Sequence, residues 1–163
     1  MMGKDKREEI IKTISENTIL NYQALDLLLG KYIGGGVYRD VFEYAPNPAY
    51  VIKVAKEEKG FISNVKEFDF WEEISWFKNE SSWVKDWFAP VKEMSSNGSF
   101  LIMQKTEVKP KKKRPSEIPC FIEDYHSENF GWIGNRYVCH DYGSQINFTG
   151  KISKKLKRSY HEL

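Results

Sequence analysis

The sequence predicts an α+β fold in which an antiparallel sheet is accompanied by one long helix. Composition is the first reason: of 163 residues, 40% are hydrophobic and 15% aromatic, which suits one domain with a sizeable core. Short runs rich in β-branched and aromatic residues also alternate with turns of Gly, Pro, Asn and Ser. Finally, residues 63–78 carry apolar side chains at helical spacing.

The N-terminal part of the chain favours helices. Residues 5–15 place isoleucines on one side of a helix, and residues 19–29 form the apolar stretch ILNYQALDLLL. The first twelve residues lack the apolar run of a signal peptide, and no apolar run of about 18 residues predicts a membrane span. Two cysteines fit a reducing compartment. These features indicate a cytoplasmic protein without a membrane segment.

Two hairpins form the predicted sheet, with the helix between them. Turns rich in Pro, Asn, Ser and Gly join the strands of each hairpin. The predicted helix over 63–78 starts at Ser63 as N-cap and carries Val65, Phe68 and Trp71 at helical spacing, with Ile74 one turn further on. A basic loop and a further strand follow, and a short helix is expected at 150–160. The predicted strands are 38–44, 50–54, 88–93, 100–105 and 136–139.

A glycine-rich turn opens the first hairpin. The stretch IGGGVYRDV, residues 33–41, contains Gly34, Gly35 and Gly36, and glycine lets a backbone approach a bound group closely. Lys53 then lies in the middle of an apolar strand, where a lysine is costly unless it has a partner.

The stretch EDYHSENFGWIGNRYVCHDYG, residues 123–143, resembles a site more than a core. Its carboxylates, histidines and asparagine cannot be buried cheaply unless they are paired or bound to something. Asp124 and Asn129 are five residues apart, and Asp141 begins an Asp-Tyr-Gly turn after one short hairpin. The spacing places acceptor groups together beside the strand at 136–139.

In this order, these motifs resemble the protein-kinase-like fold in a short, divergent form, such as phage mini-kinases. The turn at 33–41 resembles the glycine-rich loop, with Arg39 at its third glycine, and Lys53 resembles the strand lysine. The resemblance implies a helix glutamate as partner of this lysine. Glu67 is the first choice, because its face with Phe70, Trp71 and Ile74 is expected to be inward, and Glu72 and Glu73 are competitors. The form D-x-H-x-x-N around His126 is similar to aminoglycoside-phosphotransferase-like kinases, although Ile122 stands where kinases have the loop histidine. The Asp-Tyr-Gly turn resembles Asp-Phe-Gly. The resemblance covers roughly residues 30–145.

The resemblance implies a division of the chain. Residues 1–29 would be a helical extension, and residues 30–107 a kinase-like antiparallel N-lobe with one αC-like helix and the hinge. Residues 108–163 would hold the basic linker, the catalytic loop, the Asp-Tyr-Gly segment and a basic tail, a strongly reduced C-lobe without an A-P-E motif. The floor of the cleft would then be supported either by residues 5–29 or by a second copy of the chain, a homo-oligomer.

The resemblance also implies a function, an ATP- and Mg²⁺-dependent transfer of the γ-phosphate to a protein hydroxyl. Asp124 would orient the acceptor hydroxyl, Lys53 would bind the phosphates, and Asn129 and Asp141 would hold Mg²⁺. The remaining nucleotide-binding residues would have three roles. Some would cover the phosphates, some would contact the faces or the edge of the adenine ring, and one would pair with the lysine. The predicted nucleotide site comprises Gly34, Gly35, Gly36, Val41, Val51, Lys53, Glu67, Met103, Gln104 and Glu107.

Three other interpretations compete with an active kinase. A pseudokinase of weak or no activity would bind and modulate a host protein, in the host cytoplasm if the chain is viral, with Trp83 and Trp87 as part of a sticky surface. Nucleic-acid binding through the basic runs 109–114 and 151–158 is disfavoured, because the net charge is only +2. Zinc binding is disfavoured by ligand spacing. Its candidate ligands would be Cys120, His126, Cys139 and His140.

Overall fold

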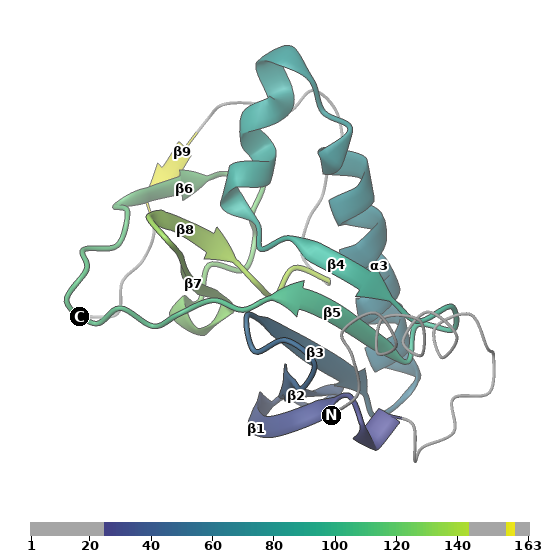
Figure 1. Ribbon diagram of the computed structural model, residues 1–163. Helices are drawn as coiled ribbons and strands as arrows, with labels where there is room; N and C mark the ends of the chain where they lie inside the picture. Colours follow the sequence, from purple (N-terminus) through teal and green to yellow (C-terminus); the bar gives the residue numbers. More distant parts are fainter. Residues whose placement is uncertain (1–24, 144–155, 159–163) are drawn as a thin grey trace. The chain divides into compact units, whose positions relative to one another are not determined.

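The computed structural model describes residues 25–143 and 156–158 of the chain. These residues form two compact units, which are described separately (Figure 1). Residues 25–68 and 91–105 belong to the first unit, and residues 69–90, 106–143 and 156–158 to the second. The helices expected at 5–15 and over most of 19–29 lie outside the described residues.

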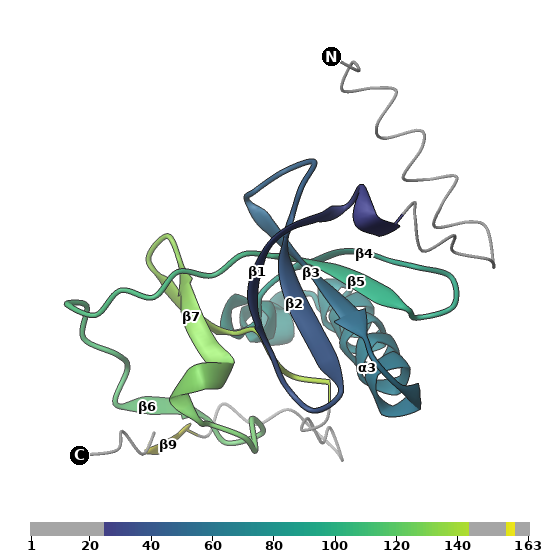
Figure 2. The same ribbon diagram turned by 90° about the horizontal axis from the view of Figure 1, so that it is seen from below.

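The first unit contains a five-stranded antiparallel sheet, whose strands lie side by side in Figure 2. Both predicted hairpins are present in it, and the strand order is β1-β2-β3-β5-β4. The second hairpin begins later than predicted, at residue 91 instead of 88, because Pro90 has no N–H to offer a sheet ladder. The strands are β1 (Leu29–Gly35), β2 (Arg39–Tyr44), β3 (Tyr50–Ala55), β4 (Val91–Met94) and β5 (Phe100–Gln104).

One face of this sheet builds a hydrophobic core. Alternation along β3 turns Ile52 to this face, where it lies opposite Ile102 of β5. Tyr44 and Phe100 extend the cluster, and Leu28 covers it at the end of a short turn before β1. All five of these side chains are at most 2% exposed. Residues of β3 next to Ile52 must therefore point to the opposite face.

The long helix α3 (Glu58–Ser75) begins five residues before the predicted start, so Ser63 is not its N-cap. Ser63 lies inside the helix, and its hydroxyl donates to the carbonyl of Lys59. The early start needs Gly60, because a Cβ there would lie 3.0 Å from Ala55, at the end of β3. A helix that follows a strand so closely has no room for a side chain at this point.

The inward face expected for Glu67, Phe70 and Ile74 is present on α3, and Asn64 is buried with them, whereas Val65 is 37% exposed. The inward stripe thus begins with two polar side chains, Asn64 and Glu67.

The second unit contains two short antiparallel strand pairs, one of which is a hairpin, together with 3-10 helices. The predicted strand over 136–139 is present as β8, which pairs with β7. The helix expected at 150–160 is wrong where the structure describes it, because residues 156–158 form a strand that pairs with β6. The elements are η1 (Asn79–Trp87), β6 (Glu117–Pro119), η2 (Ser127–Asn129), β7 (Phe130–Ile133), β8 (Arg136–Cys139) and β9 (Leu156–Arg158).

The predicted α+β class is confirmed by an antiparallel sheet and one long helix, with little other helix in the described residues. The long helix α3 follows β3 directly, as predicted. Within residues 25–143 and 156–158, no helix has the length and apolar character needed to cross a membrane.

Candidate functional site

A buried lysine and a buried glutamate form the centre of the candidate site in the first unit. Lys53 follows Ile52 on β3 and therefore points away from the hydrophobic core. Its Nζ lies 3.0 and 2.9 Å from the two carboxylate oxygens of Glu67 on α3. Lys53 is 3% exposed and Glu67 is fully buried. The pair expected from the sequence is present, and Glu72 and Glu73 are exposed instead.

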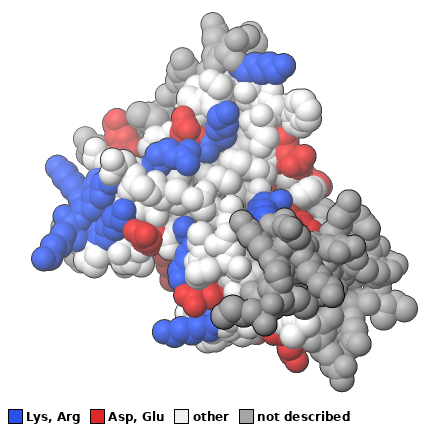
Figure 3. Space-filling view, viewed as in Figure 1, with Lys and Arg blue, Asp and Glu red and all other residues white. Residues whose placement is uncertain are grey.

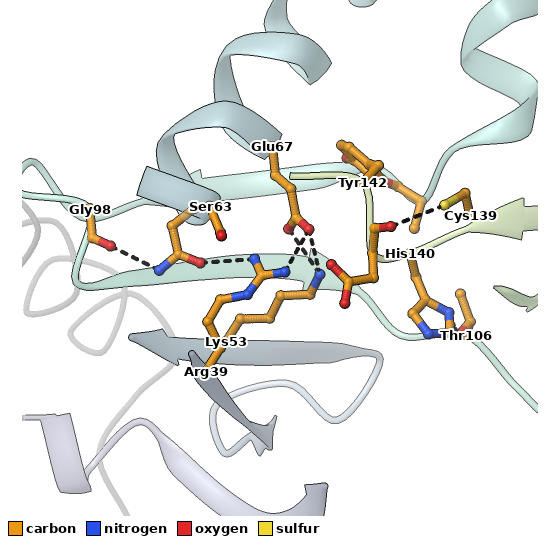
Figure 4. A network of polar contacts seen from close by, with 12 residues as sticks. Arg39, Lys53, Ser63, Glu67, Gly98, Thr106, Cys139, His140 and Tyr142 are labelled. Carbon is orange, nitrogen blue, oxygen red and sulfur yellow. Dashed lines mark hydrogen bonds and ion pairs between the residues drawn. The ribbon is translucent and has the colours of Figure 1, made fainter. Parts of the chain in front are cut away.

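Arg39 is a second cation on the same carboxylate (Figure 4). Its Nη2 lies 2.9 Å from Glu67 Oε1, and its Nη1 donates to Asn64 Oδ1 at 3.2 Å. Asn64 Nδ2 then donates to the carbonyl of Gly98, in the turn between β4 and β5. Arg39, at the third glycine position of the loop motif, therefore binds two side chains of α3 and does not act as part of the glycine-rich loop.

Strand alternation explains why Arg39 reaches Glu67. Arg39 and Val41 share one face of β2, and Val41 lies opposite Lys53 in the β2–β3 register. Arg39 lies opposite Ala55, two residues further along β3, so both cations stand on the face that α3 covers. This role of Arg39 was not predicted from the sequence. Arg39 lies two residues before Val41, which was predicted to face the ligand, and this spacing in a strand puts both side chains on the same face.

Glu67 remains charged although it is completely buried. Burial raises its pKa, but the charges of Arg39 and Lys53 and their hydrogen bonds outweigh that effect and lower the pKa from 4.5 to about 2. Near neutral pH the carboxylate is therefore ionised. This network of charges holds α3 to the sheet through β2 and β3.

The glycine-rich turn connects β1 to β2. A Cβ added at Gly34 or Gly36 would meet no atom of the described residues within 4 Å, so packing against these residues does not require glycine at either position. Gly35 differs, because a Cβ there would collide with Asp40. Lys56 Nζ binds the carbonyl of Gly36 at 2.6 Å and so tethers the turn to the end of β3. Open backbone at Gly34 and Gly36 suits the close approach of a ligand.

The apolar residues predicted to hold adenine share the sheet face of Lys53. Val51 lies opposite Met103, and Val41 lies opposite Lys53. The alternation of side chains along the strands puts all four on the same face of the sheet. Met103 is fully buried on β5. Gln104 ends β5 and Glu107 follows three residues later. Their contact with a nucleotide stays a prediction.

Glu107 has a backbone role that the sequence did not reveal. Its N–H donates to the carbonyl of Trp132 on β7, and its carbonyl accepts from the N–H of Trp132, both at 2.9 Å. A backbone N–H that is already bonded cannot also donate to an adenine edge. The predicted edge contact would therefore have to come from another group of residues 104–107.

The catalytic-loop candidates lie in the second unit, in the loop before β7. Asp124 Oδ1 accepts from the N–H of His126 at 3.3 Å, which closes a small turn. The single turn η2 follows, held by the N–H of Asn129 and the carbonyl of His126. Asn129 thereby stands immediately before β7. Ile122, in the position of the kinase loop histidine, is a buried core side chain.

The Asp-Tyr-Gly segment leaves β8 at the same end of the hairpin. The N–H of His140 donates to the carbonyl of Asn129 at 2.8 Å, which continues the β7–β8 ladder by one bond. The two predicted metal-binding residues, Asn129 and Asp141, are therefore neighbours through the backbone. Asp124 belongs to the loop that enters this hairpin.

Tyr142 anchors the Asp-Tyr-Gly segment. Its ring packs edge-on against Phe70 and Phe88 with centroids 5.5 and 5.1 Å away. Its hydroxyl donates to the carbonyl of Ala89 at 2.9 Å. The hydroxyl makes a bond that a phenylalanine at this position could not make.

The donor set fits magnesium better than zinc. In the part of the chain that the structure describes, no group of three or more His, Cys, Asp or Glu side chains could hold a metal ion. The zinc site weighed from the sequence therefore has no support. Magnesium commonly takes one or two protein oxygens and completes its shell with substrate phosphates and water. Coordination of Mg²⁺ by Asn129 and Asp141 stays a prediction.

The basic loop between β5 and β6 is partly engaged by the β7–β8 turn. Lys109 Nζ donates to the carbonyl of Gly134, and Lys112 Nζ donates to Asn135 Oδ1, both at 2.9 Å. Lys112 also lies 4.0 Å from the ring centroid of Trp132. Figure 3 shows Lys and Arg side chains gathered where this loop lies. Two cations of the run therefore serve the fold, which leaves fewer for a polyanion.

Comparison with known proteins finds likeness to solved structures only. No family model matches the chain, and no curated protein matches it. A gentamicin complex of APH(2")-IIa is 24% identical, with a TM-score of 0.41, over 54% of this chain and 28% of its own. A streptomycin–ATP complex of APH(2")-IIa is 22% identical, with a TM-score of 0.40, over 58% of this chain and 30% of its own. ADP-bound APH(2'')-Ib is 20% identical, with a TM-score of 0.39, over 62% of this chain and 29% of its own. The chain thus spans less than a third of their length.

Proposed function

We propose that the chain is a phosphotransferase that binds ATP with Mg²⁺ and transfers the γ-phosphate to a hydroxyl group, with a protein as the acceptor. The observation that carries the proposal is the buried Lys53–Glu67 pair, on a strand and helix that follow a glycine-rich turn. A lysine held this way can present its ammonium group to phosphate oxygens. Cys120 and Cys139 form no disulfide in the described residues, which suits a cytoplasmic setting.

Each proposed role follows from the residue's chemistry. Lys53 binds the nonbridging phosphate oxygens, while the open backbone of Gly34 and Gly36 covers the phosphates. Asn129 and Asp141 would hold Mg²⁺, which neutralises charge on the phosphates. Asp124 accepts the proton of the acceptor hydroxyl. The hydroxyl oxygen bonds to the γ-phosphorus, the bond from that phosphorus to the bridging oxygen breaks, and ADP leaves.

The proposal assigns nucleotide binding to residues of each unit, and binding measurements test each assignment separately. Lys53→Met in the first unit and Asp141→Asn in the second should each weaken binding of ATP with Mg²⁺ by at least tenfold. Glu73→Gln, an exposed change on α3, serves as the control and should bind like the wild type. If only one of the two variants loses affinity, the assignment of the unaffected residue is wrong.

Transfer itself is tested with γ-labelled ATP and Mg²⁺. Wild-type protein is compared with Asp124→Asn, with cell lysate proteins in one arm and an aminoglycoside in the other. Label on lysate proteins that requires Asp124 supports a protein acceptor. Label on the aminoglycoside supports a small-molecule acceptor instead. Nucleotide binding without any transfer would remove catalysis from the proposal.

A second candidate is a kinase-like protein that binds a host protein without turnover. Trp76, close after the end of α3, is 75% exposed, and exposed tryptophan is common in protein interfaces. Trp83 and Trp87, weighed as a sticky surface, are only partly exposed, and Trp83 packs against Phe121. A host protein captured by the wild type and by Lys53→Met, but not by Trp76→Ala, would favour this candidate.

A further inference from the structure

His140 makes three hydrogen bonds within the second unit. Its Nδ1 lies 2.9 Å from Thr106 Oγ1, and its Nε2 lies 3.0 Å from the carbonyl oxygen of Glu128. Its backbone N–H donates to the carbonyl of Asn129. Figure 4 shows the imidazole beside Thr106. One residue therefore joins the segment after β5, the loop before β7 and the segment after β8.

The partners determine which nitrogen carries the proton. A carbonyl oxygen can only accept, so Nε2 must donate to Glu128. In the neutral ring Nδ1 then accepts from the hydroxyl of Thr106. Both ring nitrogens are satisfied by this tautomer, and the ring plane is fixed from two sides.

Thr106 is itself held firmly. A Cβ added to Gly131 of β7 would lie 2.5 Å from Thr106 Oγ1 and 2.6 Å from its Cβ, so the threonine side chain packs directly over that glycine. The next residue, Glu107, exchanges both backbone hydrogen bonds with Trp132. The anchor for Nδ1 is therefore attached to β7 at two consecutive residues.

The other contacts of His140 lie beside the predicted metal-binding residues. Its ring holds the carbonyl of Glu128, which precedes Asn129, and its backbone holds the carbonyl of Asn129. Asp141 follows His140 directly, and the thiol of Cys139 donates to the carbonyl of Asp141 at 3.4 Å. The backbones that carry Asn129 and Asp141 are therefore tied together through His140.

We propose that His140 is a positioning residue that sets the spacing of Asn129 and Asp141 for Mg²⁺, with Thr106 as its anchor. The inference rests on the proposed function. Magnesium requires near-octahedral geometry at about 2.0–2.1 Å, so small shifts of a ligand backbone weaken its binding. Groups that orient metal ligands typically change metal affinity by about 10–100-fold.

The test measures ADP affinity by calorimetry on the full chain, once with Mg²⁺ and once with EDTA. The ratio of the two affinities is the readout, because general damage to the fold lowers both values and leaves the ratio unchanged. In His140→Ala the affinity in EDTA should match the wild type, and the gain from Mg²⁺ should fall by about tenfold or more. Full retention of the gain in His140→Ala would overturn the inference.

Thr106 offers a matched pair of variants. Thr106→Val keeps the shape but removes the hydroxyl, and should lose part of the Mg²⁺ gain. Thr106→Ser keeps the hydroxyl and should retain the gain. These variants decide the question if His140→Ala fails to fold: equal gains in both would overturn the role of Thr106 and the inference with it. A wild type that binds no ADP under either condition would instead refute the proposed function.

Discussion

Glu67→Gln is the perturbation that tests the buried network most directly. The substitution keeps the size of the side chain and removes the carboxylate that Lys53 and Arg39 share. A buried cation that loses its charged partner is poorly compensated by a neutral amide. We therefore expect a large loss in the free energy of unfolding, although no residue of the hydrophobic core is altered.

The magnitude follows from the pKa of Glu67. The pKa is about 2 in the folded protein against an ordinary value of 4.5, a difference of about 2.5 units. At about 1.4 kcal/mol for each unit, the charged form stabilises the fold by about 3 kcal/mol at neutral pH. Removing one partner of a buried ion pair typically costs about 3–5 kcal/mol, which agrees. The melting temperature should fall by roughly 6–12 °C.

The pH dependence gives an independent check with a definite sign. The folded pKa lies below the unfolded one, so the stabilisation is complete above about pH 4.5 and is lost as the pH falls toward 2. Glu67→Gln has no carboxyl group to titrate. The difference in stability between wild type and variant should therefore shrink as the pH falls through this range.

Urea unfolding followed by circular dichroism and tryptophan fluorescence measures both effects. Glu73→Gln is the matched control, because Glu73 is exposed on the same helix. Its free energy of unfolding should stay within about 0.5 kcal/mol of the wild type. The reasoning is refuted if the two variants are equally stable at pH 7, or if the deficit of Glu67→Gln does not change between pH 5 and pH 2.5.

Three further outcomes are expected from the same structure. Arg39→Met should cost about 1–3 kcal/mol, because it removes a charged hydrogen bond to Glu67, and its effect should be strongly non-additive with Glu67→Gln in a double-mutant cycle. Tyr142→Phe should lower the free energy of unfolding by about 1 kcal/mol through loss of the bond to Ala89, measured by urea unfolding. Gly36→Ala should leave the melting temperature nearly unchanged but weaken ATP binding by calorimetry; unchanged affinity would argue against phosphate approach at this turn.

Several parts of the fold could be predicted because local signals determine them. Proline- and glycine-containing turns set the hairpins, and strand alternation placed Ile52 inward and Lys53 on the opposite face. The pairing of Lys53 with Glu67 followed from two requirements, a partner for the lysine and an inward helix position. Both requirements can be stated from sequence spacing alone.

The start of α3 could not be predicted in the same way. Local preference favoured Ser63 as N-cap, and Gly60 argued against an earlier start. In the structure Gly60 is needed because the helix begins directly against the end of β3. Tertiary packing overrode helix propensity at this point, whereas the predicted inward positions Glu67, Phe70 and Ile74 are buried as expected.

By itself, the sequence determined the α+β class, the order of the motifs and the pair of Lys53 with Glu67. Only the tertiary structure decided that Arg39 shares Glu67, and that His140 joins Thr106 to the loop before β7. The physical reason is distance along the chain: Thr106 and His140 are 34 residues apart, and Arg39 and Glu67 are 28 apart. Contacts of this kind depend on sheet register and loop path, which local residue preferences do not specify.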